Sequence, residues 1–568
     1  MIDHSDLIAR SRLWIEGDPD PGTRQDLQAM IEAGEWAELT ERMDGLLEFG
    51  TAGLRGAVEA GSNRMNRATV IRTTAGLAEY LRQRPGVVVV GYDGRTSSQT
   101  FAEDTVGVLT AAGLEVRYFN EPVPTPIVAF AAKDLEAAGA VVITASHNPP
   151  ADNGYKVYDS NAAQIVPPTD ESISMAIARA RPANEIPRVE NAFETATNAV
   201  ALDIDEVYER YRSQVEMVRP SRRVAGTLTF AYTPIHGVGW RFLERLMRDG
   251  GHDRVSVVES QRDPDGAFPT VSFPNPEEPG AMDEVMELGT RVEADLVLAN
   301  DPDGDRLAVA IPHGSSGWKG LTGNQVGVLM ADWLLDSWSG PQPAIVINSI
   351  VSSPMLADVA GIHDARFEQT LTGFKWIANA ALDLEDQGHG TFLFGYEEAL
   401  GYSVGPVVRD KDGLSAALVF ADMAAALADA GSSVEERLAN LYERVGLWVS
   451  SQLSISRPGA SGLEEIDAAM ARIGDRIPDD VAGHGVMEVV DYRQGADQRP
   501  RWLATTALVA LSLPGGGRVL VRPSGTEPKL KIYVDLPGSI GKDLSLSEAA
   551  LLAQADQIAQ ATARFLGF

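Results

Sequence analysis

The chain has 568 residues, of which 44% are hydrophobic and 23% charged, so it has ample material for several hydrophobic cores. Its formal net charge of -32 argues against nonspecific binding to nucleic acid or anionic membranes, because both are polyanions that need a basic face. The chain contains no cysteine, which excludes disulfides, thiolate catalysis and cysteine-ligated zinc and favours a reducing compartment.

The amino-terminal stretch MIDHSDLIARSRLW carries acids and lacks an apolar core, and no apolar run reaches the roughly 18 residues of a membrane span. We therefore expect a cytoplasmic protein with neither a nucleic-acid nor a membrane partner. A small phosphorylated ligand is still allowed, provided that positive charge is concentrated in its pocket.

After a polar helical lead-in, helices and buried strands alternate along the chain. Residues 77–83 predict a helix, 86–95 a strand, 106–119 a helix and a strand, and 138–143 a further strand. The alternation recurs over residues 227–306 and 325–402, which is typical of mostly parallel α/β sheets. From about residue 450, short strands mix with two amphipathic helices, a pattern that favours a smaller α+β unit. The predicted class is therefore three related α/β domains with mixed or parallel sheets (1–205, 206–315 and 316–450) followed by an α+β domain (451–568).

The segment TASHNPP, Thr144 to Pro150, directly follows the apolar run Ala138 to Ile143. A loop that is stopped by two prolines at the carboxyl end of a buried strand has the placement of a ligand-binding loop in an α/β sheet. We expect Ser146 to be displayed there, not buried, as a nucleophile or phosphate carrier. An ordinary surface turn would explain the same residue types.

The segment DPDGDR places Asp301, Asp303 and Asp305 at alternating positions after another buried strand. Three converging carboxylates match the hard oxygen ligands that Mg²⁺ prefers, and Arg306 could offer a planar fork to a phosphate. A calcium loop of the EF-hand type fails because its sixth position would be Arg306 and its twelfth Pro312. A solvated acidic turn is the remaining alternative.

Two later segments carry further polar groups. In RPSGTEPKLKIY, hydroxyls and backbone N–H groups lie beside arginine and lysine and could form a nest for a phosphate dianion, although a plain hairpin turn would explain Pro523 and Gly525. In GYEEALGY, Glu397 and Glu398 could accept hydrogen bonds from sugar hydroxyls, or could be an acidic pair at the start of a helix.

These segments occur in the order found in the α-D-phosphohexomutase superfamily, which includes phosphoglucomutases and phosphomannomutases. FGTAGLRG at residues 49–56 and TGFKWI at residues 372–377 complete the pattern, so the chain resembles that superfamily over essentially its whole length. The forms FGTAGLRG, TGFKW and GYEEALGY look most like the branch that holds the second phosphoglucomutase and the phosphopentomutases. This resemblance implies four domains around a central cleft, with the fourth domain binding phosphate.

The resemblance also implies a role for each matching residue. Ser146 would carry the phosphoryl group and, with Asp301, Asp303 and Asp305, bind Mg²⁺. Lys156 would be the general acid/base, with His147 and Arg306 as further catalytic residues. The implied substrate-binding residues are Arg55, Lys375, Glu397, Glu398, Arg522, Ser524, Gly525 and Thr526.

The implied reaction interconverts hexose 1-phosphate and hexose 6-phosphate, with glucose preferred, through a phosphoserine enzyme and a bisphosphorylated sugar primed by glucose 1,6-bisphosphate. Mannose and pentose phosphates are alternatives, because Ala399 and Tyr402 stand where many relatives carry serine and histidine. A phosphoserine-dependent phosphohydrolase, and a protein that only senses sugar phosphates, are the alternatives outside the class. We expect a monomer or weak homodimer, and a Lys156 amine whose pKa neighbouring arginines lower.

Overall fold

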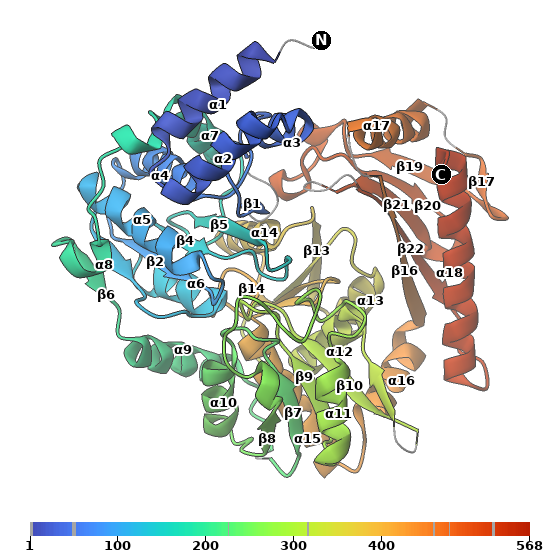
Figure 1. The fold of residues 1–568 in the computed structure, drawn as a ribbon. Helices are drawn as coiled ribbons and strands as arrows, with labels where there is room; N and C mark the ends of the chain where they lie inside the picture. Colours follow the sequence, from blue (N-terminus) through green and yellow to red (C-terminus); the bar gives the residue numbers. More distant parts are fainter. Residues whose placement is uncertain are drawn as a thin grey trace. The chain divides into compact units, whose positions relative to one another are not determined.

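The structure is a computed structural model that describes residues 4–47, 53–224, 226–314, 317–457, 460–475, 478–524 and 529–568 (Figure 1). The chain divides into two compact units. The first comprises Met1–Arg219, Ala225–Gly320 and Gly401–Ala421, and the second Pro220–Val224, Leu321–Leu400 and Asp422–Phe568.

A six-stranded sheet of order β1-β5-β4-β2-β3-β6 forms the first layer of the first unit. Strands β4, β2, β3 and β6 run parallel, whereas β5 and β1 add to the β4 edge in antiparallel orientation. The bounds are β1 (Leu54–Ala57), β2 (Val88–Tyr92), β3 (Val116–Tyr118), β4 (Gly139–Ile143), β5 (Asp152–Tyr158) and β6 (Ala199–Ala201).

Helices cover this sheet because β2 and β4 are buried along their whole length and need apolar cover on both faces. Leu77, Leu81, Phe101 and Val106 pack with Val88 and other strand residues in one core. The helices before β7 are α1 (Ser5–Gly17), α2 (Pro21–Ala33), α3 (Trp36–Arg42), α4 (Arg67–Leu81), α5 (Ser98–Ala111), α6 (Thr125–Asp134), α7 (Thr169–Arg179), α8 (Ala192–Thr195) and α9 (Ile204–Val218).

A second sheet in this unit has the order β11-β10-β9-β7-β8. Strand β7 is parallel to β8 and β9, and β10 and β11 extend the sheet in antiparallel orientation. Its elements are β7 (Phe230–Thr233), α10 (Trp240–Asp249), β8 (Val255–Val257), α11 (Asp283–Arg291), β9 (Leu296–Ala299), β10 (Ala308–His313) and β11 (Gly317–Gly320), and β15 (Gly401–Val404) also belongs to this unit.

The second unit holds a parallel group in which β12 pairs with β13 and β14. Its elements are α12 (Gly323–Asp336), β12 (Ala344–Ser349), α13 (Met355–Ile362), β13 (Arg366–Thr370), α14 (Phe374–Asp386), β14 (Thr391–Glu397) and α16 (Val434–Val445).

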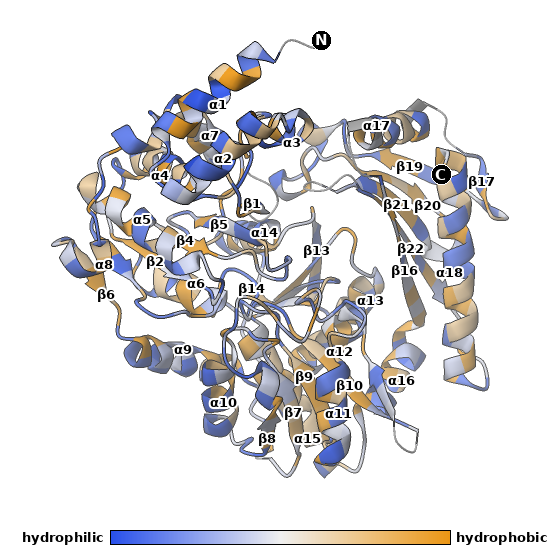
Figure 2. Cartoon of the chain, in the orientation of Figure 1, coloured by the Kyte–Doolittle hydropathy of each residue, from blue (hydrophilic) through white to orange (hydrophobic). Residues whose placement is uncertain are grey.

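An antiparallel five-stranded sheet of order β16-β22-β21-β20-β19 follows in the same unit. One stripe of α18, including Ile558 and Leu566, packs in the core of this sheet, and Figure 2 shows hydrophobic and hydrophilic residues alternating along this helix. Its elements are β16 (Leu447–Ser456), α17 (Ala460–Asp475), β19 (Glu488–Asp491), β20 (Val509–Ser512), β21 (Arg518–Pro523), β22 (Lys529–Gly538) and α18 (Leu544–Leu566), with β17 (Asp480–Val481) and β18 (His484–Gly485) as a small hairpin. The predicted class, α/β domains followed by an α+β domain, is confirmed.

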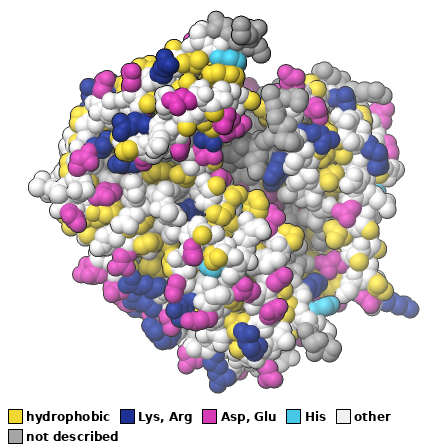
Figure 3. Space-filling view, viewed as in Figure 1, with side chains coloured by type: hydrophobic (Ala, Val, Ile, Leu, Met, Phe, Trp, Pro, Cys, Tyr) yellow, Lys and Arg dark blue, Asp and Glu magenta, His cyan; other side chains and the backbone are white. Residues whose placement is uncertain are grey.

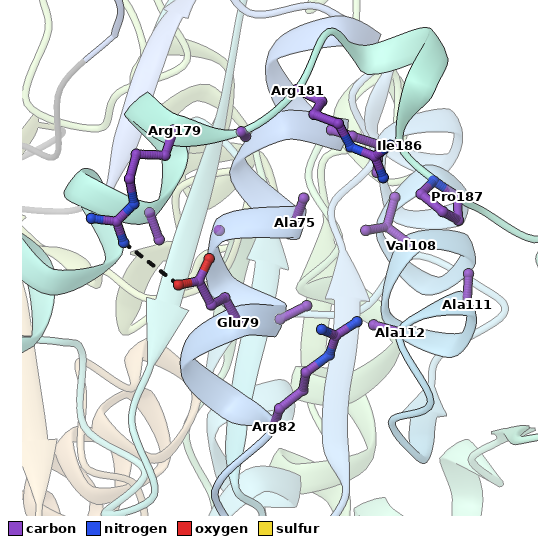
Figure 4. Close-up of a pocket in the computed structure, with 14 residues that line it drawn as sticks. Ala75, Glu79, Arg82, Val108, Ala111, Ala112, Arg179, Arg181, Ile186 and Pro187 are labelled. Carbon is purple, nitrogen blue, oxygen red and sulfur yellow. Dashed lines mark hydrogen bonds and ion pairs between the residues drawn. The ribbon is translucent and has the colours of Figure 1, made fainter.

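A cavity of about 330 Å³ lies among the carboxyl-terminal parts of α4, α5 and α7 (Figure 4). Arg82, Arg179 and Arg181 line it, and Arg179 pairs with Glu79 at 3.5 Å. Basic side chains at the carboxyl ends of helices offset the partial negative charge of the last carbonyl groups. This role accounts for Arg82 at the C-cap of α4 and for Arg179 in the last turn of α7.

The surface agrees with the composition, because acidic side chains are spread widely over the face in Figure 3. Within the described ranges, no single helix is both long and apolar enough to cross a membrane. The pair formed by α15 (Gly413–Asp429) and α16 meets that criterion only together, with a bend of 92° between the two helices. Leu418 and Phe420 of α15 are buried, as expected of a core helix.

Candidate active site

The loop after β4 holds Ser146 in an unusual backbone conformation. The Ser146 backbone N–H donates to Thr144 Oγ1 at 2.8 Å, and the φ of Ser146 is +50°. That left-handed conformation costs about 1–2 kcal/mol in a residue with a side chain, so surrounding contacts must hold it.

Ser146 Oγ donates a hydrogen bond of 2.6 Å to Asp301 Oδ2. The expectation that Ser146 would be displayed is wrong, since the residue is only 1% exposed. The cause is the aspartate loop after β9, which lies against the serine.

The structure brings the three aspartates of that loop together. Asp301, Asp303 and Asp305 are fully buried, and one oxygen of each lies within 4.8 Å of the others. The Arg306 backbone N–H donates to Asp301 Oδ1 at 2.9 Å, and Gly304 takes the positive φ of +70° that the tight turn requires.

This cluster has the donor set of a site for a hard divalent cation. Among the described residues, no group donates a hydrogen bond to the buried Oδ1 atoms of Asp303 and Asp305. Burial, together with the neighbouring Asp305 and Asp303, raises the pKa of Asp301 well above its ordinary value. Uncompensated carboxylate oxygens at this spacing fit Mg²⁺.

Lys156 lies on β5, opposite Val142 of β4, and is fully buried. Its Nζ lies 2.8 Å from Asp303 Oδ2 and 2.9 Å from Asp305 Oδ2. Burial opposes the charge of this ammonium, but the two carboxylates outweigh it and raise the pKa of Lys156. The expectation of a lowered pKa is therefore wrong, because the nearest charges are carboxylates and not arginines.

The His147 ring lies between the Ser146 hydroxyl and the Arg306 guanidinium. Its Nδ1 lies 3.1 Å from Ser146 Oγ, and its Nε2 lies 3.4 Å from Arg306 Nη2. Burial, and then the charges of Arg306 and Arg55, lower the pKa of His147 well below the ordinary 6.5. The imidazole is therefore neutral near pH 7.

Arg55 and Arg306 bring positive charge to the same site. Arg55 on β1 donates to Asn148 Oδ1 at 3.1 Å, and Arg306 pairs with Glu277 at 3.0 Å. The Nε atoms of both arginines are buried without a hydrogen-bond acceptor among the described residues. Buried donors of this kind fit phosphate oxygens.

Sequence reasoning missed Lys411 and Thr125. Lys411 Nζ lies 3.2 Å from Asp305 Oδ2, and Thr125 Oγ1 donates to Asp303 Oδ2 at 2.6 Å. A lysine between Asp410 and Asp412, just before a helix, is a signal that could have found Lys411. Nothing in the sequence around Thr125 identifies it.

In the second unit, Glu397 is the last residue of strand β14 and Glu398 begins a turn, which excludes the helix-start alternative. Glu397 Oε1 accepts a hydrogen bond of 2.8 Å from the N–H of Gly373, the residue before α14, so it holds the start of the helix that carries Lys375. Glu398 Oε2 accepts hydrogen bonds from Ser349 Oγ at 3.2 Å and Ser352 Oγ at 3.1 Å.

Arg522 lies near the end of β21, and Ser524 begins the turn that follows this strand. Arg522 lies directly opposite Lys531 in the register of β21 and β22, and the Ser524 N–H donates to the Lys529 carbonyl at 2.7 Å. Like charges directly opposite each other across two strands repel, which an anion bound between them would relieve. Gly525 and Thr526 lie outside the described residues.

The sequence matches four domain models in succession. They describe the phosphoglucomutase/phosphomannomutase alpha/beta/alpha domain I at residues 46–184, domain II at 205–314, domain III at 322–445 and the C-terminal domain at 489–539. The chain belongs to the phosphoglucomutase/phosphomannomutase family. Membership confirms the resemblance to the phosphohexomutase superfamily and makes the protein a phosphomutase-type enzyme, an intramolecular phosphotransferase.

Two relatives and one solved structure show how far this family likeness extends. The chain is 39% identical to a probable phosphomannomutase of Haemophilus influenzae, covering 84% of this chain and 94% of that one. It is 36% identical to a phosphoribomutase of Saccharomyces cerevisiae, covering 94% and 93% of the two chains. The open-form crystal structure of parafusin, a phosphoglucomutase from Paramecium, shares the fold with a TM-score of 0.70 at 19% identity, covering 92% of this chain and 96% of that one.

Proposed function

We propose that this protein interconverts hexose 1-phosphate and hexose 6-phosphate, with glucose preferred, through a phosphoserine at Ser146 and a bisphosphorylated sugar. The observation that carries the proposal is the 2.6 Å contact between Ser146 Oγ and Asp301 in the buried three-aspartate cluster. A serine held against such a cluster is suited to receive and return a phosphoryl group.

In the first half of the reaction, a sugar hydroxyl attacks the phosphorus on Ser146, and the bond from phosphorus to Ser146 Oγ breaks. His147 Nδ1, 3.1 Å from that oxygen, is placed to hold the proton that the serine gains. Lys156, once neutral, takes the proton of the attacking sugar hydroxyl, so one proton leaves the sugar as one reaches the departing oxygen of Ser146. The second half is the reverse, with the other phosphate of the bisphosphate returning to Ser146.

Lys156 is protonated before the reaction begins, and this limits its role as a base. Its ammonium, stabilised by Asp303 and Asp305, gives up a proton less readily than an ordinary lysine and must lose one before it can act as a base. Asp301, Asp303 and Asp305 would hold Mg²⁺, which when bound neutralises charge on the phosphoryl group.

The bisphosphorylated sugar must bind in both orientations, because either of its phosphates can be the one returned to Ser146. Arg522, Ser524, Gly525 and Thr526 would bind the phosphate that is not reacting, while Lys375, Glu397 and Glu398 would contact the sugar. Catalytic amounts of glucose 1,6-bisphosphate would prime the enzyme.

Pentose or mannose phosphates are the second candidate substrates. The phosphoribomutase and phosphomannomutase names of the two relatives support them, and so do Ala399 and Tyr402, which depart from the more common serine and histidine. Turnover of glucose, mannose, glucosamine and ribose 1-phosphates, each with trace bisphosphate, would rank the substrates.

The decisive experiment follows phosphorylation and product together. We expect intact-mass analysis to show one added phosphoryl group on the active protein and none on Ser146→Ala, which should bind sugar phosphate but not isomerise it. Substantial turnover by Ser146→Ala would contradict the carrier role. Steady release of inorganic phosphate from glucose 1-phosphate would instead identify a phosphohydrolase.

A further inference from the structure

Arg95 donates hydrogen bonds to the backbone of residues 146–152, which we call the serine loop. It follows β2 and is 4% exposed. Its Nη1 donates to the carbonyls of Pro149 at 2.7 Å and Asp152 at 2.9 Å. Its Nη2 donates to the carbonyls of Ser146 at 2.7 Å and Asn148 at 2.6 Å.

A single guanidinium thus satisfies four carbonyls within seven residues of the chain. Only a planar fork with two terminal nitrogens can do this, since the acceptors lie in pairs on two sides. One of the four belongs to Ser146, the residue that the structure holds at a positive φ. The contacts of Arg95 therefore fix the backbone conformation that aims Ser146 Oγ at Asp301.

Arg95 is itself held by Asp93 and Phe268. Asp93 Oδ1 accepts hydrogen bonds from the Arg95 N–H at 3.0 Å and from Ser98 Oγ at 2.6 Å. The Arg95 Nε lies 3.4 Å from Asp93 Oδ2, and the guanidinium lies over the Phe268 ring at 5.1 Å. A side chain locked in this way can impose its geometry on a loop, whereas a mobile one would follow the loop.

We propose that Arg95 is a positioning residue for phosphoryl transfer, which keeps Ser146 in the one backbone conformation that is competent to carry the phosphoryl group. This inference rests on the proposed function. The hydrogen bonds of the Arg95 guanidinium go to backbone carbonyls, one of them that of Ser146, so Arg95 acts through the Ser146 main chain. Its loss should therefore slow the transfer and leave sugar-phosphate binding nearly intact.

The test compares Arg95→Lys and Arg95→Ala with a matched control. Lysine keeps the charge but has only one nitrogen, which cannot serve both pairs of carbonyls. We expect kcat to fall by about 100-fold or more in each variant with KM within about threefold, because a misplacement of about 1 Å costs on that order in rate. Millimolar guanidinium should restore part of the lost rate to Arg95→Ala but not to Arg95→Lys.

The control is Arg219→Ala. Arg219 is also buried, and its guanidinium donates to the Gly250 carbonyl at 2.7 Å and to Glu216 Oε2 at 2.7 Å, acceptors that lie outside residues 146–152. The Arg219→Ala variant should unfold at a lower temperature than wild type. Its kcat should equal that of wild type when both are assayed well below the melting temperature of the variant. A kcat of Arg95→Lys within about twofold of the wild-type value would overturn the inference. It would also be overturned if the whole loss of kcat/KM came from an increase in KM.

The two proposals fail differently. If wild-type protein neither becomes phosphorylated on Ser146 nor isomerises sugar phosphates, the proposed function is wrong. If wild type does both and Arg95→Lys does them equally fast, only the role of Arg95 is wrong. If Arg95→Ala does not fold, Arg95→Lys alone decides.

Discussion

Lys156 Nζ lies 2.8 Å from Asp303 Oδ2, and both side chains are fully excluded from solvent. Replacing the lysine by methionine removes the positive charge that compensates Asp303 and Asp305. An unpaired buried charge typically costs about 3–5 kcal/mol, so Lys156→Met should unfold at a markedly lower temperature in the presence of a chelator.

Mg²⁺ should raise the melting temperature of Lys156→Met more than that of wild type, because the cation then meets carboxylates that no ammonium neutralises. Differential scanning calorimetry with and without Mg²⁺ measures both effects. An equal Mg²⁺ response in the two proteins would mean that the cation binds elsewhere.

The positive charge of Arg306 should help to keep the pKa of the His147 imidazole low. Burial and the guanidinium both disfavour protonated imidazole, so Arg306→Gln should raise the pKa of His147 toward its ordinary value. The imidazole would then gain its proton at a higher pH than in wild type. NMR titration of the His147 ring measures this shift without reference to substrate, and the acid limb of kcat should move upward in the same direction.

Arg522→Ala should weaken sugar-phosphate binding. A hydrogen bond to a charged group contributes about 1.5–3 kcal/mol, which corresponds to an increase in KM of roughly 10- to 150-fold. Arg501→Ala is the control, since that arginine lies in the same unit but pairs with Asp383 on α14. An unchanged KM in Arg522→Ala would mean that the distal phosphate binds at another place.

Ser352→Ala tests how the Glu398 carboxylate is held. The serine donates to Glu398 Oε2 and accepts the Glu398 N–H at 3.0 Å, so the variant should loosen a group that is proposed to bind sugar hydroxyls. We expect a loss of about 1 kcal/mol, or roughly fivefold in KM. Ser337→Ala, which removes a contact to the Trp333 carbonyl at the end of α12, should leave KM unchanged.

The core strands were predictable because short β-branched runs such as residues 139–143 are buried on both faces and interrupted by polar turns. The antiparallel pairing of β5 and β1 at the edge of the sheet could not be predicted, because it depends on partners that are distant along the chain. The ion pair of Lys156 was missed for the same reason. Its carboxylate partners lie 147 and 149 positions away, and no local pattern distinguishes them from the arginines nearby.

Because β1 carries Arg55 and pairs along its whole length with β5, the amino-terminal tenth of the sequence cannot be trimmed without consequence. A truncated form starting after residue 60 would lose one cation of the serine site. It would also leave the backbone of β5 open to pairing with other molecules, and such edges favour aggregation. Light scattering of that truncated form against the full chain would reveal the resulting particles.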